Sequence, residues 1–126
     1  MKGKFFRCSA CGNVVYQMNE ETRHLTCCGK EMEELVPSVV DVAAEKHVPR
    51  VEDVDGRVEV QVGSVIHPMQ EKHYIEWIAA ENEDGNIHIK YLKPGDEPKV
   101  NFCNHHKKIR CIYDYCNLHG LWVHEI

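Results

Sequence analysis

Apolar and polar residues alternate along much of the chain, with the period of two that is typical of β-strands. The clearest run lies between Arg57 and Val65, where Val58, Val60 and Val62 alternate with charged or polar residues. Such alternation predicts a strand with one buried face. Similar but shorter patterns predict further strands over residues 14–16, 39–43, 75–79, 87–92, 100–103 and 109–115. No segment of useful length has a helical period, so the pattern predicts an all-β protein.

Turn signals separate these predicted strands. Residues 83–86 are typical of a hairpin turn, residues 93–96 of a second turn, and residues 104–108 of a polar turn. About seven short strands at this spacing favour an antiparallel β-sandwich of the immunoglobulin type. Residues 45–49 and 67–73 are expected to be loops at the ends of strands.

The chain is expected to contain two domains, residues 1–36 and residues 37–126. Pro37 ends the preceding strand, and residues 33–38 have the character of a short linker. With 126 residues and 43% hydrophobic content, the chain can bury one modest core and a small satellite. A domain as small as residues 1–36 cannot be stabilised by hydrophobic burial alone, so it needs an additional stabilising link such as a bound metal.

Charge and hydropathy exclude several classes of protein. The formal net charge is −5, and no basic run is interleaved with aromatic residues, which argues against a nucleic-acid-binding protein. Met1 is not followed by the apolar segment of a signal peptide. No apolar run reaches the roughly 18 residues that a membrane span needs. We therefore expect no membrane association and a cytoplasmic location, where thiols stay reduced.

The cysteines of the first domain indicate a metal site. The chain has seven Cys and nine His, and an odd Cys count favours metal ligation over a disulfide scaffold. Cys8 and Cys11 form a Cys-x-x-Cys pair, and Cys27 and Cys28 are adjacent. Four thiolates form a tetrahedral site suited to iron or zinc. A zinc ribbon is the alternative, although ribbons usually carry two Cys-x-x-Cys pairs.

A second candidate site is centred on Cys116 and His119, three residues apart before Gly120. Two ligands cannot complete a metal site, and further candidates lie near Pro or Gly at strand ends or in loops: His47, His67 and His73. Four imidazoles and one thiolate make five ligands, whereas zinc normally takes four. Five ligands on iron leave one octahedral position open for a small molecule.

Spacing alone does not select these four histidines from nine. The other five are interpreted as ordinary polar residues: His24, His88, His105, His106 and His124. Cys103 and Cys111 lie within predicted strands and are expected to be small buried hydrophobic residues.

Several separated motifs, in order, resemble the desulfoferrodoxin family of two-iron superoxide reductases. The two cysteine pairs of the first domain are similar to its desulforedoxin-like domain. The other matching motifs are Glu45-Lys46-His47-Val48-Pro49, His67-Pro68-Met69, His73-Tyr74-Ile75-Glu76-Trp77-Ile78, Leu92-Lys93-Pro94-Gly95 and Tyr115-Cys116-Asn117-Leu118-His119-Gly120-Leu121-Trp122.

The resemblance implies two irons per chain, an FeS4 centre and an Fe(His)4(Cys) centre. Cys116 would be the axial ligand of the second iron, and the equatorial ligands would be His47, His67, His73 and His119. It further implies one-electron reduction of superoxide to hydrogen peroxide, a rubredoxin-type electron donor and a homodimer. Lys46 would steer superoxide and order a proton-delivering water, and Glu45 would ligate the oxidised iron after product leaves.

Three alternatives compete with this interpretation. A plain electron-transfer iron protein would not need the open ligand position. In a superoxide dismutase, superoxide both oxidises and reduces the metal. A strongly donating thiolate ligand disfavours the second step, in which the metal would accept an electron from superoxide. A zinc-stabilised binding protein would not need so many His and Cys ligands.

Overall fold

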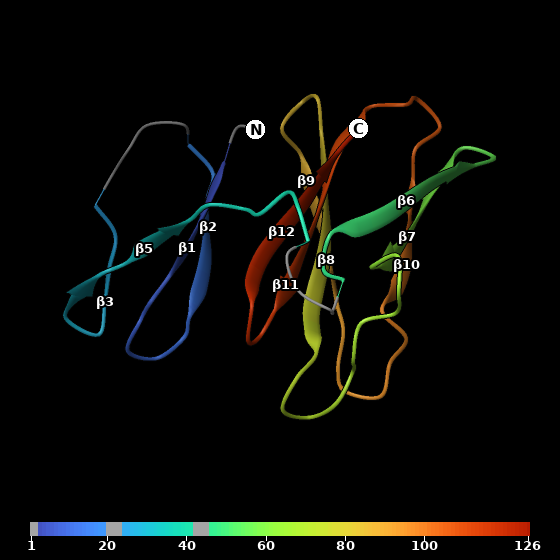
Figure 1. Cartoon of the computed structure of the whole chain (residues 1–126). Helices are drawn as coiled ribbons and strands as arrows, with labels where there is room; N and C mark the ends of the chain where they lie inside the picture. Colours follow the sequence, from blue (N-terminus) through green and yellow to red (C-terminus); the bar gives the residue numbers. More distant parts are fainter. Residues whose placement is uncertain (1–2, 20–23, 42–45) are drawn as a thin grey trace. The chain divides into compact units, whose positions relative to one another are not determined.

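The computed structural model describes residues 3–19, 24–41 and 46–126, and Figure 1 shows its course. The chain divides into two compact units, Met1–Val36 and Pro37–Ile126. Within the described ranges the regular structure is entirely β, which confirms the predicted all-β class. In these same ranges no helix is long and apolar enough to cross a membrane.

The described residues of the first unit form five short strands. Strand β1 (Lys4–Arg7) lies between β2 (Val14–Gln17) and β5 (Glu33–Leu35) in an antiparallel sheet of three strands. Strands β3 (Thr26–Cys27) and β4 (Lys30–Glu31) form a separate hairpin. The apolar cluster of this unit has three buried members, Phe6, Cys8 and Met32. So small a core agrees with the expected need for a metal staple.

The second unit contains two antiparallel sheets. One has the strand order β10-β7-β6 and consists of β6 (Pro49–Val54), β7 (Arg57–Val62) and β10 (Lys99–Cys103). The other has the order β12-β11-β8-β9. Its strands are β8 (Ile75–Asn82), β9 (Ile87–Tyr91), β11 (Ile109–Cys116) and β12 (Gly120–Glu125).

The core of the second unit draws residues from both sheets. Val58, Val60 and Val62 are buried as their alternation predicts, while Arg57 and Glu59 are exposed. The same cluster contains residues from β8, β10 and β11, namely Ile75, Ile78, Ala80, Phe102, Ile109, Ile112 and Cys116. The immunoglobulin type of this arrangement stays a prediction.

Some local predictions are wrong. Val39 and Val40 are exposed and lie outside any strand, and residues 42 and 43 are outside the described ranges. Cys103 is also exposed, because Phe102 before it points into the core and successive side chains of a strand face opposite ways. Cys111 is buried, as predicted.

Candidate metal centres

The first unit brings Cys8, Cys11, Cys27 and Cys28 together to form the first metal site, with all four sulfurs within 4.8 Å of one another. The first pair lies in the turn between β1 and β2, where the Gly12 amide donates to the carbonyl of Cys8 at 2.9 Å. The second pair lies in the turn of the β3–β4 hairpin, with Cys28 at a φ of 54°.

The four thiols perturb the ionisation of one another. The backbone amide of Cys11 lowers the pKa of Cys8 to about 7. Contact with Cys11, where the two sulfurs are 3.7 Å apart, raises the pKa of Cys27 to about 12. The Cys11 thiol also raises the pKa of Cys28. A metal ion replaces these shared protons, so the donor set fits a tetrahedral iron or zinc site.

The second unit brings His47, His67, His73, Cys116 and His119 together to form the second metal site, again with ligand atoms within 4.8 Å of one another. These residues come from several separate segments: the loop before β6, the segment between β7 and β8, the end of β11 and the turn before β12. In Figure 1 these segments meet around the lower ends of β8 and β11.

The four imidazoles form a closed ring in which each meets its neighbours edge-on. Ring centroids are 4.6 Å apart for His47 and His67, 4.7 Å for His67 and His73, 5.1 Å for His73 and His119, and 4.8 Å for His119 and His47. The Cys116 sulfur lies 3.7 Å from Nε2 of His67 and 3.7 Å from Nδ1 of His119. This arrangement fits one metal ion held by four nitrogens and one sulfur.

Hydrogen bonds orient these ligands. Nδ1 of His67 lies 2.7 Å from the carbonyl oxygen of Pro68 and must donate to it, which leaves Nε2 as the ligand atom. The Asp41 carboxylate accepts from the backbone amides of His47 at 2.5 Å and Val48 at 3.1 Å. Asp41 therefore holds the backbone of His47 and Val48 in place.

Asn117 joins two ligand-bearing segments. Its side-chain oxygen accepts from the Tyr74 amide at 2.9 Å, and its side-chain nitrogen donates to the Lys72 carbonyl at 3.0 Å. His73 is thereby held close to Cys116 and His119.

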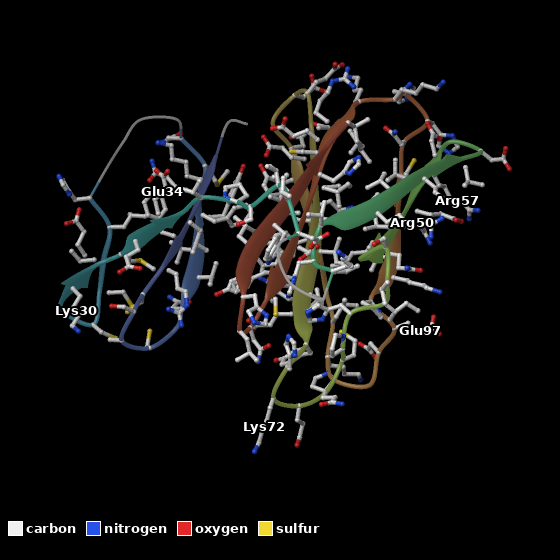
Figure 2. All side chains as sticks on the ribbon, in the orientation of Figure 1. Lys30, Glu34, Arg50, Arg57, Lys72 and Glu97 are labelled. Atoms are coloured by element: carbon white, nitrogen blue, oxygen red, sulfur yellow. The ribbon has the colours of Figure 1, made fainter. Side chains whose placement is uncertain are left out.

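The second metal site is buried on one side and open on the other. His47 and His67 are 1% exposed and Cys116 is 0% exposed, whereas His73 is half-buried and His119 is exposed. The side formed by His73 and His119 is therefore the more exposed side of the cluster. Lys72, labelled in Figure 2 in the loop before β8, lies next to His73 in sequence and points away from the sheets.

Comparison with known protein families identifies the family to which this chain belongs. Residues 1–35 match the family described as "Desulfoferrodoxin, N-terminal domain", and residues 39–125 match the family described as "Desulfoferrodoxin". The chain belongs to the desulfoferrodoxin family. The resemblance seen in the motifs is thus confirmed.

Known proteins are similar to two thirds or more of the chain. A "Desulfoferrodoxin homolog" of Archaeoglobus fulgidus is 45% identical over 117 residues, covering 93% of this chain and 92% of the relative. A "Superoxide reductase" of Pyrococcus abyssi is 38% identical and covers 68% of this chain and 90% of its own. The crystal structure of the superoxide reductase from Treponema pallidum has a TM-score of 0.83 and 30% identity, with 98% of each chain covered.

The donor sets of the two metal sites fit two irons per chain, as expected for a member of this family. One site has four thiols, and the other has four imidazoles with one thiol. Lys46 and Glu45 were also expected at the second metal site, and only Lys46 lies within the described residues. Lys46 is half-buried directly before His47. Glu45 lies outside the described residues. The histidines interpreted as ordinary polar residues belong to neither ligand cluster.

Three supporting residues were not predicted as part of the second metal site: Asp41, Asn117 and Trp122. The indole of Trp122 stacks on the His47 ring, with centroids 4.6 Å apart and planes 13° from parallel. Asn117 and Trp122 lie within a family motif, so the motif carried a signal for them. Asp41 lies six residues before His47 in a segment predicted to be a strand, and nothing in the pattern indicated its role.

Proposed function

We propose that this chain is a superoxide reductase that acts at the second metal site. The reaction combines superoxide with one electron and two protons to give hydrogen peroxide, and it forms no dioxygen. The observation that carries the proposal is the closed ring of four imidazoles with one thiolate and an exposed side. The superoxide reductases among its relatives support the same activity.

The ligand set suits reduction of a small anion. When bound, iron supplies the reducing electron and one open coordination position. The four imidazoles are neutral donors, and the Cys116 thiolate adds a strong donor that favours passing an electron to substrate. Burial of Cys116 and His67 keeps water from the sulfur, because both are at most 1% exposed.

Lys46 is the residue proposed to attract superoxide. The chain carries a formal net charge of −5, so an anion needs a local positive field to approach. Lys46 is half-buried and directly precedes the ligand His47, and in this proposal it would supply that charge. It would also order a water that delivers protons. The proposed role of Glu45, ligation of oxidised iron after product leaves, remains a prediction for a residue outside the described ranges.

The proposal extends to partners and location. Each turnover consumes one electron, so a small redox protein of the rubredoxin type is the expected donor. The small core of the first unit would gain buried area from a second copy, which favours a homodimer. No disulfide joins any of the seven cysteines, all of which lie in the described ranges, and this suits a reducing cytoplasm.

A product count tests the activity. The iron-loaded protein is reduced, freed of excess reductant and given superoxide in small steps, while peroxide, dioxygen and oxidised second-site iron are recorded. One peroxide per superoxide with no dioxygen is expected. Half a peroxide with dioxygen evolved would make the protein a dismutase. A peroxide yield no higher than that of spontaneous superoxide decay would contradict the proposal. It would favour the alternative, an electron-transfer protein that uses the first metal site.

The role of Lys46 has its own test. Lys46→Ala should lower the second-order rate constant for superoxide on the order of tenfold and flatten its dependence on ionic strength. Lys99→Ala is the matched control, because it removes the same charge from an exposed position on β10. Equal rates in the two variants would remove Lys46 from the mechanism.

A further inference from the structure

Gly63 lies directly after β7 and is buried against the backbone of Lys46. A Cβ built on Gly63 would lie 2.7 Å from the Lys46 carbonyl oxygen and 2.8 Å from its carbonyl carbon and its Cβ. Contacts below 3.0 Å essentially never occur for a real Cβ. The φ of Gly63 lies outside the left-handed region, so the close approach of Lys46 is the feature that excludes a side chain at this position.

The segment that carries Gly63 is itself fixed. The side-chain amide of Gln61 donates to the Gly63 carbonyl at 2.7 Å, and the Gly63 amide donates to the Val65 carbonyl at 3.2 Å. The amide of the ligand His67 donates to the Val62 carbonyl at 2.8 Å, which closes the same turn. Gly63 therefore cannot easily move aside if its volume increases.

The opposing segment is fixed on its other side. Lys46 leads directly into His47, whose amide is held by Asp41 and whose ring stacks on Trp122. Lys46 is thus confined between an anchored metal ligand and the backbone of Gly63. The Gly63 contact sets how closely the Lys46 segment approaches the turn that ends at His67.

We propose that Gly63 is a positioning residue that places the Lys46 ammonium beside the approach to the second metal site. The inference rests on the proposed function only for its kinetic consequence; the placement of Lys46 can be measured without it. An added methyl group at position 63 would force a shift between position 63 and the Lys46 backbone, because its contacts of 2.7–2.8 Å are shorter than the 3.0 Å below which real Cβ contacts essentially never lie.

The first test is the chemical reactivity of Lys46 in the iron-loaded protein. Wild type, Gly63→Ala and the neighbouring control Ser64→Ala, at an exposed position, are treated with an amine-acylating ester. Mass spectrometry then compares the acylation rate of Lys46 with that of Lys99. Gly63→Ala should change this ratio about threefold or more, and Ser64→Ala should leave it unchanged. An unchanged ratio in folded Gly63→Ala overturns the proposal.

The second test is a double-mutant cycle on the superoxide rate constant. Gly63→Ala should lower the rate about tenfold in the wild-type background and not further in the Lys46→Ala background. A similar loss in both backgrounds means that Gly63 acts on the metal ligands and overturns the proposal. If Lys46→Ala alone keeps the wild-type rate, the proposed catalytic role of Lys46 fails, and the reactivity ratio still decides the role of Gly63.

A variant without added volume covers the case in which Gly63→Ala does not fold. Gln61→Ala removes the hydrogen bond to the Gly63 carbonyl and inserts no atoms. It should shift the Lys46 acylation ratio in a protein that still binds iron. A wild-type ratio in Gln61→Ala would then overturn the proposal.

Discussion

At the scale of single residues, aromatic stacking supports the second metal site. Trp122 is 6% exposed and lies flat against His47, which is 1% exposed. The indole therefore fixes the plane of the imidazole before any metal binds. Loss of an outer-shell group that orients a metal ligand typically lowers metal affinity on the order of 10- to 100-fold.

We therefore expect Trp122→Leu to weaken iron binding at the second metal site about tenfold. A competition titration with a chelator of known affinity measures the change. Trp77→Leu is the matched control, because Trp77 stacks on Tyr115 with ring centroids 5.5 Å apart and planes 11° from parallel. Equal losses of affinity in the two variants would contradict an effect through His47.

A buried thiol outside both metal sites gives a prediction about pH. Burial raises the pKa of Cys111 to about 11 from its ordinary value of 9.0. Since the folded state keeps its proton while the unfolded state loses it, Cys111 stabilises the fold fully below pH 9 and loses this effect as pH rises toward 11. Cys111→Ala should show a smaller loss of stability than wild type across this interval, measured by urea unfolding. Parallel pH profiles would contradict the assignment.

Cys103 and Cys111 show what a sequence can reveal at this scale. All nine predicted ligands lie in the two clusters. The pairing of the cysteines in the first unit was sufficient to predict its site, whereas the family motifs were needed to select four histidines from nine. Cys103 and Cys111 both lie in strands, yet β10 is an edge strand and β11 is central in its sheet. Burial on the second face depends on which strands become neighbours, and local alternation does not contain that information.

At the scale of elements, β11 is the strand on which the second unit most depends. It is central in the sheet β12-β11-β8-β9, contributes Ile109 and Ile112 to the core and ends at the ligand Cys116. Strand β11 therefore contributes both to core packing and to metal binding.

Ile112→Ala should destabilise the second unit by about 3 kcal/mol, because it removes buried methyl groups and leaves a cavity. Ile112 is 0% exposed, whereas Ile126 is 56% exposed. The same substitution at Ile126 should cost much less. Chemical unfolding of both variants checks the difference, and similar values would mean that Ile112 is not a core residue.

The missed strand β6 shows why some elements escaped prediction. Asp55 and Gly56, with φ values of 49° and 78°, form the hairpin turn between β6 and β7. Asp-Gly is a strong hairpin signal, but Glu52 and Asp53 interrupt the alternation before it. Pairing with β7 holds β6 in place although its own pattern is weak. Strands β3 and β4, of two residues each, are too short for any periodicity.

At the scale of the whole molecule, each unit depends on its metal to a different degree. The first unit has three residues in its buried cluster, whereas the core cluster of the second has ten. Binding free energy of a structural metal is folding free energy in small domains. The first unit should therefore unfold when its metal is removed, and the second should persist.

Cys28→Ser tests this asymmetry. It should abolish metal binding at the first metal site and raise amide hydrogen exchange across residues 3–19 and 24–36, while residues 46–126 keep their protection. Cys103→Ser, at an exposed cysteine outside both clusters, is the control and should leave exchange unchanged. Protection of the first unit in Cys28→Ser would show that it folds without its metal.

The spread of the ligands along the sequence also has a consequence for biosynthesis. The first set of donors is complete once residue 28 has been added, but the second awaits His119. At about 5–20 residues per second, these events are separated by roughly 5–20 s on the ribosome. The nascent chain therefore offers a finished thiolate site to the cellular iron supply well before its imidazole site exists.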